Sequence, residues 1–145
     1  MSRQRSKARS LAVQAIYQWQ MAGQPVGEIV AHFLAEHGGK KLDGPYFQDI
    51  VSGVTANLGH IDQGLADFLD RDIERVDPVE RAILRIAGYE LLLHPEIPYR
   101  VVINEAVDLA KVFGAEQGHR YVNGVLDKAA HKLRPLEMAA RKQPS

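Results

Sequence analysis

The sequence predicts an all-α fold of about seven helices, packed as two helical sub-bundles. Seven segments repeat apolar residues at intervals of three and four, the spacing that gathers side chains on one face of a helix. No segment alternates apolar and polar residues between turn signals, as a half-exposed strand would. The 145 residues are 46% hydrophobic and 25% charged, a composition that suits one soluble domain.

Four helices are predicted in the first half of the chain. Glycine and proline interrupt helices, because glycine costs backbone entropy and proline lacks an amide hydrogen. Gly23 and Pro25 end the first helix, and Gly38 with Gly39 ends the second. The predicted ranges are 3–22, 25–37, 45–58 and 62–69.

Three more helices are predicted in the second half. Asp77 can cap the fifth helix, Pro78 suits its first turn, and Glu80 can return a hydrogen bond to the cap. This helix is apolar around most of its circumference, so we expect it to be central. The last two helices form a hairpin broken at Gly114. We expect a single domain over residues 1–145, with sub-bundles at about 1–76 and 77–134 and a flexible tail at 135–145.

Charge is balanced overall but is segregated along the chain. The sequence has 18 basic and 18 acidic residues. Residues 1–20 contain four cations and no acid, whereas residues 61–80 contain seven acids and two arginines. The basic segment favours a surface that binds phosphate groups, and the acidic segment favours a basic protein partner.

The first predicted helix has the clearest functional pattern. Its cations oppose the helix dipole and have no acid one turn away, so they do not serve helix stability. They are Arg3, Arg5, Lys7 and Arg9. Arg5, Arg9 and Tyr17 fall on one face, where cations can bind phosphates and the ring can stack on an unpaired base. This arrangement suits single-stranded RNA, and a solvated helix end is the alternative interpretation.

The residues give little support for an enzyme. The sequence contains no HExxH, GxxxxGK[ST] or GxSxG motif, and no GxGxxG motif after a strand. It has no cysteine, and its six histidines are scattered. We therefore expect no catalytic residue, no cofactor and no metal site. No apolar run approaches the roughly 18 residues of a membrane span, so we expect a cytoplasmic protein without membrane partners.

Five segments distributed along the chain form a more specific pattern. They are ARSLAVQAIYQWQ, YFQDIVSGV, VERAILRIAGYELL, INEAVDLAKVFG and YVNGVLDKAA. In this order and at these separations they resemble the NusB family of bacterial transcription antitermination factors, over most of residues 8–134. The resemblance implies an all-helical, non-catalytic adaptor. Such an adaptor binds the boxA element of ribosomal RNA leader transcripts together with ribosomal protein NusE, within the RNA polymerase elongation complex and its other Nus factors.

The resemblance also implies site residues. The family's arginine-rich N-terminal segment and the aromatic residue of its first helix bind RNA, and the matching residues are Arg3, Arg5, Lys7, Arg9 and Tyr17. A second stretch that approaches RNA precedes the last motif, and the matching residues are Gln117, His119, Arg120 and Tyr121. Gln117 stands where an AEDSH-like stretch has a carboxylate. We expect the loss of this acid to strengthen or re-tune RNA binding.

The acidic segment is the expected surface for NusE. Ribosomal proteins are typically basic, and complementary charge speeds association. We expect Glu74 and Glu80 to contribute to this surface. Two alternatives remain at this point. The chain could be a NusB-like accessory domain of a ribosomal RNA methyltransferase, which would need a further α/β domain. It could also be a helical assembly protein, in which a homodimer covers the basic face of the first helix.

Overall fold

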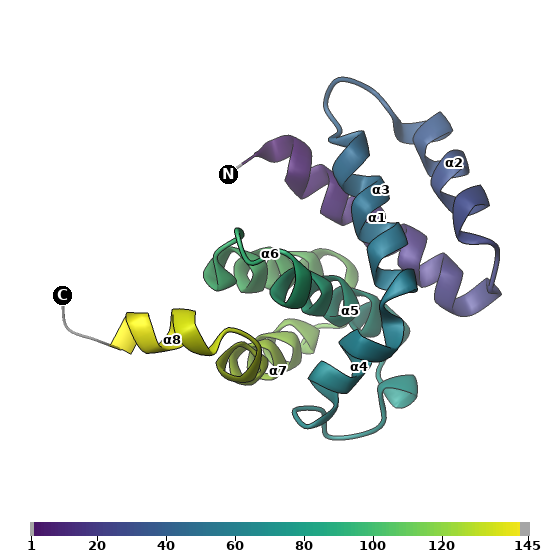
Figure 1. Cartoon of the computed structure of the whole chain (residues 1–145). Helices are drawn as coiled ribbons and strands as arrows, with labels where there is room; N and C mark the ends of the chain where they lie inside the picture. Colours follow the sequence, from purple (N-terminus) through teal and green to yellow (C-terminus); the bar gives the residue numbers. More distant parts are fainter. Residues whose placement is uncertain (1, 143–145) are drawn as a thin grey trace.

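The helices begin and end close to the capping and breaking residues of the sequence. A computed structural model describes residues 2–142, and within them it contains eight α-helices, one short 3₁₀ helix and no strand (Figure 1). The α-helices are α1 (Arg3–Ala22), α2 (Val26–His37), α3 (Gly44–Ala56), α4 (Leu58–Ala66), α5 (Pro78–Leu93), α6 (Tyr99–Phe113), α7 (Gly118–Leu133) and α8 (Pro135–Lys142). The 3₁₀ helix is η1 (Ile73–Arg75). The predicted all-α class is confirmed.

Two of the three predicted capping features are present at the start of α5, the Asp77 cap and Pro78, whereas the carboxylate of Glu80 lies against Gly118. The side chain of Asp77 accepts hydrogen bonds from the backbone N–H groups of Val79 and Glu80, at 3.1 and 3.2 Å. Pro78 occupies the first turn, where no helical N–H is needed. The end of α1 is also set by a residue next to it in the sequence, because Gly23 adopts a left-handed conformation with a φ of 68°. These caps fix two of the boundaries that matter for the candidate site.

Helix α5 is the centre of the molecule, as predicted. All of its residues from Glu80 to Leu91 are buried, and it packs against α1, α3, α4, α6 and α7 (Figure 1). Gly53 of α3 permits one of these contacts, because a side chain there would collide with the ring of Tyr89. A helix surrounded in this way buries most of its circumference, which explains why most of its residues are apolar.

The division into sub-bundles lies earlier in the chain than predicted. Helices α1, α2 and α3 pack against one another, but α4 packs mainly against α5 and α7. A Cβ atom at Gly88 of α5 would lie only 3.0 Å from a methyl carbon of Ile61 in α4, which shows how closely these two helices approach. Gly64 of α4 similarly faces Leu133 of α7. Helix α4 therefore belongs with the second sub-bundle, and residues 71–77 lie within that sub-bundle.

Residues 135–142 form helix α8, where the sequence predicts a flexible tail. The buried guanidinium group of Arg134 donates hydrogen bonds to the backbone carbonyls of Glu90, Leu91, His94 and Ile97. Glu137 pairs with Arg134 at 2.6 Å and also accepts the backbone N–H of Tyr99. Met138 is buried against the core. These contacts correct the prediction for residues 135–142, and residues 143–145 lie outside the described part of the chain.

Two general features of the described residues bear on function. None of the helices within residues 2–142 has the length and apolar character needed to cross a membrane. The same residues contain no group of three or more histidine, aspartate or glutamate side chains arranged to hold a metal ion.

Candidate nucleic-acid interface

Arg9 is buried in the core, which corrects its expected role as a phosphate ligand. Its side chain is only 2% exposed, and its guanidinium nitrogens lie 2.9 Å from the carboxylates of Glu90 in α5 and Glu105 in α6. The hydroxyl of Tyr46 in α3 donates a hydrogen bond to Glu90. Burial acts to lower the pKa of Arg9, but the hydrogen bond and attraction to Glu90 outweigh it, and the pKa is raised. Arg9 stays charged and joins four helices.

This buried network also holds the basic start of α1. Arg5, one turn before Arg9, lies over the ring of Tyr46 with its guanidinium carbon 4.2 Å from the ring centroid, a cation–π distance. It also approaches Asp43 at 3.8 Å. The Arg5 side chain is half-exposed, so it lies at the rim of the candidate surface, while Arg3 and Lys7 are exposed.

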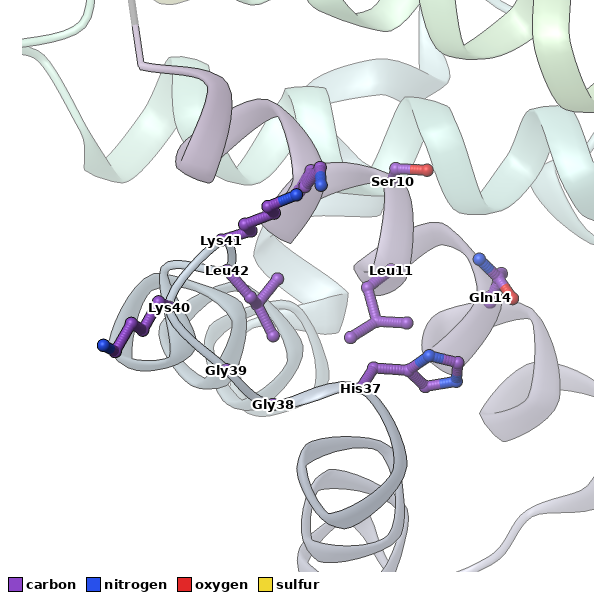
Figure 2. A pocket seen from close by; sticks show the side chains of 10 residues that line it. Ser10, Leu11, Gln14, His37, Gly38, Gly39, Lys40, Lys41 and Leu42 are labelled. Atoms are coloured by element: carbon purple, nitrogen blue, oxygen red, sulfur yellow. The ribbon is translucent and has the colours of Figure 1, made fainter.

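A basic groove lies between α1 and the loop that connects α2 to α3 (Figure 2). Its volume is about 570 Å³. The lining residues include no Asp or Glu, and they are Lys7, Ser10, Leu11, Gln14, His37, Gly38, Gly39, Lys40, Lys41 and Leu42. None of its three lysines forms an ion pair within the described residues. Unpaired cations around a concave surface favour anion binding.

Lys40 and Lys41 are absent from the sequence-based prediction. They follow the second helix, about 30 residues after the cations of the first helix. The loop is held against α1 by two hydrogen bonds of Gln4. Its side-chain amide donates to the backbone carbonyl of Lys40 at 2.7 Å, and its backbone carbonyl accepts the N–H of Asp43. The pattern Gly38-Gly39-Lys40-Lys41 marks a basic turn, but only the fold shows which helix it faces.

An apolar groove of about 480 Å³ continues along the same helix. It is lined by Val13, Gln14, Tyr17, Gln18, Met21, Ala22, Phe33, Val79 and Phe113. Tyr17 is 39% exposed and Met21 is 57% exposed, so the groove presents aromatic and apolar surface to solvent. Gln14 lines both grooves, and the two are therefore neighbours on α1. Cations beside an exposed aromatic ring are typical of surfaces that bind unpaired nucleotides.

The predicted RNA-binding residues at the start of α7 differ in exposure and in their contacts. Gln117 precedes α7 and is exposed, as is Arg120, which forms no ion pair with the described residues. Phe113, at the end of α6, lines the apolar groove, so the turn that carries Gln117 starts at the edge of that groove. Tyr121 donates a hydrogen bond to Asp70 at 3.1 Å, which ties it to the segment after α4. His119 is half-buried.

Glu80 is buried, which corrects its expected place on a partner surface. It is 8% exposed and packs under Gly118, where any side chain would collide with its carboxylate. Burial and the nearby charge of Asp77 raise the pKa of Glu80. Glu80 therefore joins the start of α5 to the start of α7 and offers little surface to a partner.

Glu74 remains on the surface and lines an acidic groove. Its side chain is 73% exposed and lies 3.1 Å from Arg85, which is itself buried and also paired with Asp62. The groove, of about 470 Å³, is lined by Asp62, Gln63, Ala66, Leu69, Arg71, Asp72, Ile73 and Glu74. Arg71 is held by Asp70 at 2.7 Å. The groove thus combines several carboxylates with apolar side chains.

Comparison with known proteins identifies the family. The NusB family model matches residues 6–131. The transcription antitermination protein NusB of Nitrosococcus oceani is 55% identical over 97% of this chain and 95% of its own length. The protein of the same name from Pseudomonas savastanoi pv. phaseolicola is 49% identical over 98% of this chain and 86% of its own length.

Solved structures agree with the sequence relatives. NusB of T. maritima superposes with a TM-score of 0.84 at 30% identity, over 96% of this chain and 99% of that chain. A chain from the crystal structure of antitermination factors NusB and NusE in complex with double-stranded RNA gives a TM-score of 0.83 at 29% identity, over 91% of this chain and 99% of that chain. On these matches of sequence and fold, the chain belongs to the NusB family.

Proposed function

We propose that this chain is a transcription antitermination factor that binds boxA-like RNA along α1 and binds ribosomal protein NusE through a separate surface. It acts as a non-catalytic adaptor to the RNA polymerase elongation complex, together with other Nus factors. The observation that carries the proposal is the pair of neighbouring grooves that share Gln14. One is rimmed by unpaired lysines and the other exposes Tyr17. Family membership supports the same function.

The basic groove binds RNA phosphates, and the apolar groove binds RNA bases. Phosphates are attracted to Lys7 and to the other exposed cations, and this attraction weakens with salt because bound counterions are released. Bases reach the ring of Tyr17 only where they are unstacked, since a duplex hides their faces. The geometry therefore supports single-stranded RNA as the preferred ligand. The related NusB and NusE were crystallised with double-stranded RNA, so binding to duplex RNA must also be measured.

The purified protein is expected to bind a boxA-containing single strand more tightly than a scrambled strand of the same composition. A duplex of the boxA sequence is expected to bind more weakly than the single strand, because its bases cannot reach Tyr17. Fluorescence anisotropy titrations measure all three affinities. Equal affinity for the boxA and scrambled strands would contradict the proposal.

The acidic groove around Glu74 is the proposed surface for NusE. Glu74→Lys is expected to slow association with NusE about threefold at low salt, because the exposed charge steers a basic partner. Arg85 keeps its bidentate partner Asp62, at 2.9 and 3.0 Å, so the variant is expected to fold. Stopped-flow or surface-based kinetics measure the association rate.

Glu28→Lys is the matched control for Glu74→Lys. Glu28 is also exposed, but it lies on α2 and outside the acidic groove. The control makes the same change of charge and is expected to leave the association rate within about 1.5-fold of wild type. An equal slowing by both variants would show an effect of net charge alone and would remove the proposed surface.

A cytoplasmic location follows from the proposed function, because an adaptor for nascent RNA works where RNA is transcribed. A homodimer that covers the grooves of α1 would compete with RNA. Mass measurement with and without boxA RNA tests this form: RNA is expected to convert any dimer into an RNA-bound monomer, whereas a dimer unaffected by RNA would favour an assembly role.

A further inference from the structure

We propose that the loop from Gly38 to Leu42 forms a second wall of the RNA interface, and that the basic groove between this loop and α1 binds one unstacked nucleotide. The inference rests on the proposed function, and it assigns a binding site to a loop whose position beside α1 only the fold shows. The nucleotide's base rests on the apolar floor formed by Leu11 and Leu42, and its phosphate lies between Lys7 and Lys41.

The shape of the groove supports a nucleotide rather than a phosphate alone. Figure 2 shows Leu11 and Leu42 pointing toward each other in the groove, with Gln14 and His37 on the same side as Leu11. Leu11 is 7% exposed and Leu42 is partly buried against the core, so together they form an apolar floor on which one face of a base can rest. The Gln14 amide offers both donors and an acceptor to a base edge. The volume of about 570 Å³ lies within the range of small-molecule sites.

The charge of the groove supports an anionic ligand. Its lining contains three lysines and no acid. Figure 2 shows the side chain of Lys41 running from the loop towards α1, whereas Lys40 points away from the groove. Lys7 lines the groove from the α1 side. A phosphate between Lys7 and Lys41 would therefore meet cations from both walls, while Lys40 contributes only a long-range field.

The position of the groove makes it continuous with the surface around Tyr17. Gln14 lines both grooves, and Lys7 and Tyr17 are ten residues apart on one helix, or about 15 Å along its axis. One strand can therefore place a nucleotide in each groove. The two sites together read consecutive parts of the strand, and the loop adds sequence preference that α1 alone lacks.

The neighbouring lysines provide a matched test. Lys41→Glu and Lys40→Glu make the same change of charge at adjacent exposed positions, and both variants are expected to unfold at the wild-type temperature. Binding of a boxA-containing single strand is measured at several salt concentrations. Lys41→Glu is expected to weaken binding about tenfold and to reduce the salt slope by about 0.7, the contribution of one phosphate. Lys40→Glu is expected to weaken binding less than about threefold and to keep the slope.

The outcomes separate this inference from the proposed function. If wild-type protein binds the boxA strand specifically but both variants lose affinity equally, the loop acts only through net charge and the nucleotide site is wrong. If wild-type protein binds boxA and scrambled strands equally, the proposed function itself fails and the site fails with it. A tenfold loss confined to Lys41→Glu, with the reduced slope, supports both.

Discussion

Arg9→Met is expected to lower the free energy of unfolding by about 3–5 kcal/mol. The substitution keeps an apolar stem of similar length but removes the charge that neutralises Glu90 and Glu105, which are 2% and 11% exposed in their side chains. Removing one partner of a buried ion pair leaves an uncompensated charge in a medium of low dielectric constant. Urea denaturation followed by circular dichroism measures the loss.

Two further variants show whether the loss comes from the buried carboxylates. Lys7→Met removes an exposed charge on the same helix and is expected to change stability by less than about 0.5 kcal/mol. Adding Glu90→Gln and Glu105→Gln to Arg9→Met removes the stranded charges and is expected to restore part of the stability. A loss below about 1 kcal/mol for Arg9→Met would contradict the structural role assigned to Arg9.

Tyr17→Ala is expected to weaken binding of boxA-containing RNA by about 1–3 kcal/mol, which corresponds to roughly 5- to 150-fold. The ring lines the apolar groove and is 39% exposed, so its removal takes away the stacking surface without opening a cavity in the core. The change in stability is therefore expected to be small. Fluorescence anisotropy with labelled RNA measures the affinity.

Tyr17→Phe separates stacking from hydrogen bonding. It keeps the aromatic face and removes only the hydroxyl, so RNA affinity is expected to stay within about threefold of wild type. If Tyr17→Phe loses as much affinity as Tyr17→Ala, the hydroxyl rather than the ring contacts RNA. If Tyr17→Ala binds as tightly as wild type, the apolar groove is not part of the RNA surface.

The fold follows from the sequence where the determining interactions are local. The range 3–22 of the first helix is confirmed because Gly23 ends it, and the fifth helix begins at Pro78 because Asp77 caps it. The central position of α5 follows from its apolar circumference. Helix α8 could not be predicted in this way, because its docking depends on Arg134, whose partners lie about 40 residues earlier in the chain.

The candidate site shows the same limit. The spacing of four residues puts Arg5 and Arg9 on one side of α1, but it does not show that Glu90 and Glu105 lie opposite Arg9, 81 and 96 residues away. Glu74 and Glu80 are both glutamates in the same acidic segment, and only the packing against Gly118 reveals that Glu80 is buried. Lys41 enters the site because the chain turns after α2. The sequence thus shows which residues are charged, and its local pattern shows which of them share a helix face. Tertiary packing decides which of these charged side chains reach the surface.

Titration of a boxA-containing single strand, with and without NusE and at several salt concentrations, tests the adaptor function most directly. Neutralisation of about four phosphates predicts a slope of log K against log salt near −3. Because one chain joins two modest interfaces, NusE is expected to tighten binding of boxA RNA and to leave a scrambled strand nearly unchanged. Equal weak binding to both strands, unaffected by NusE, would contradict the account.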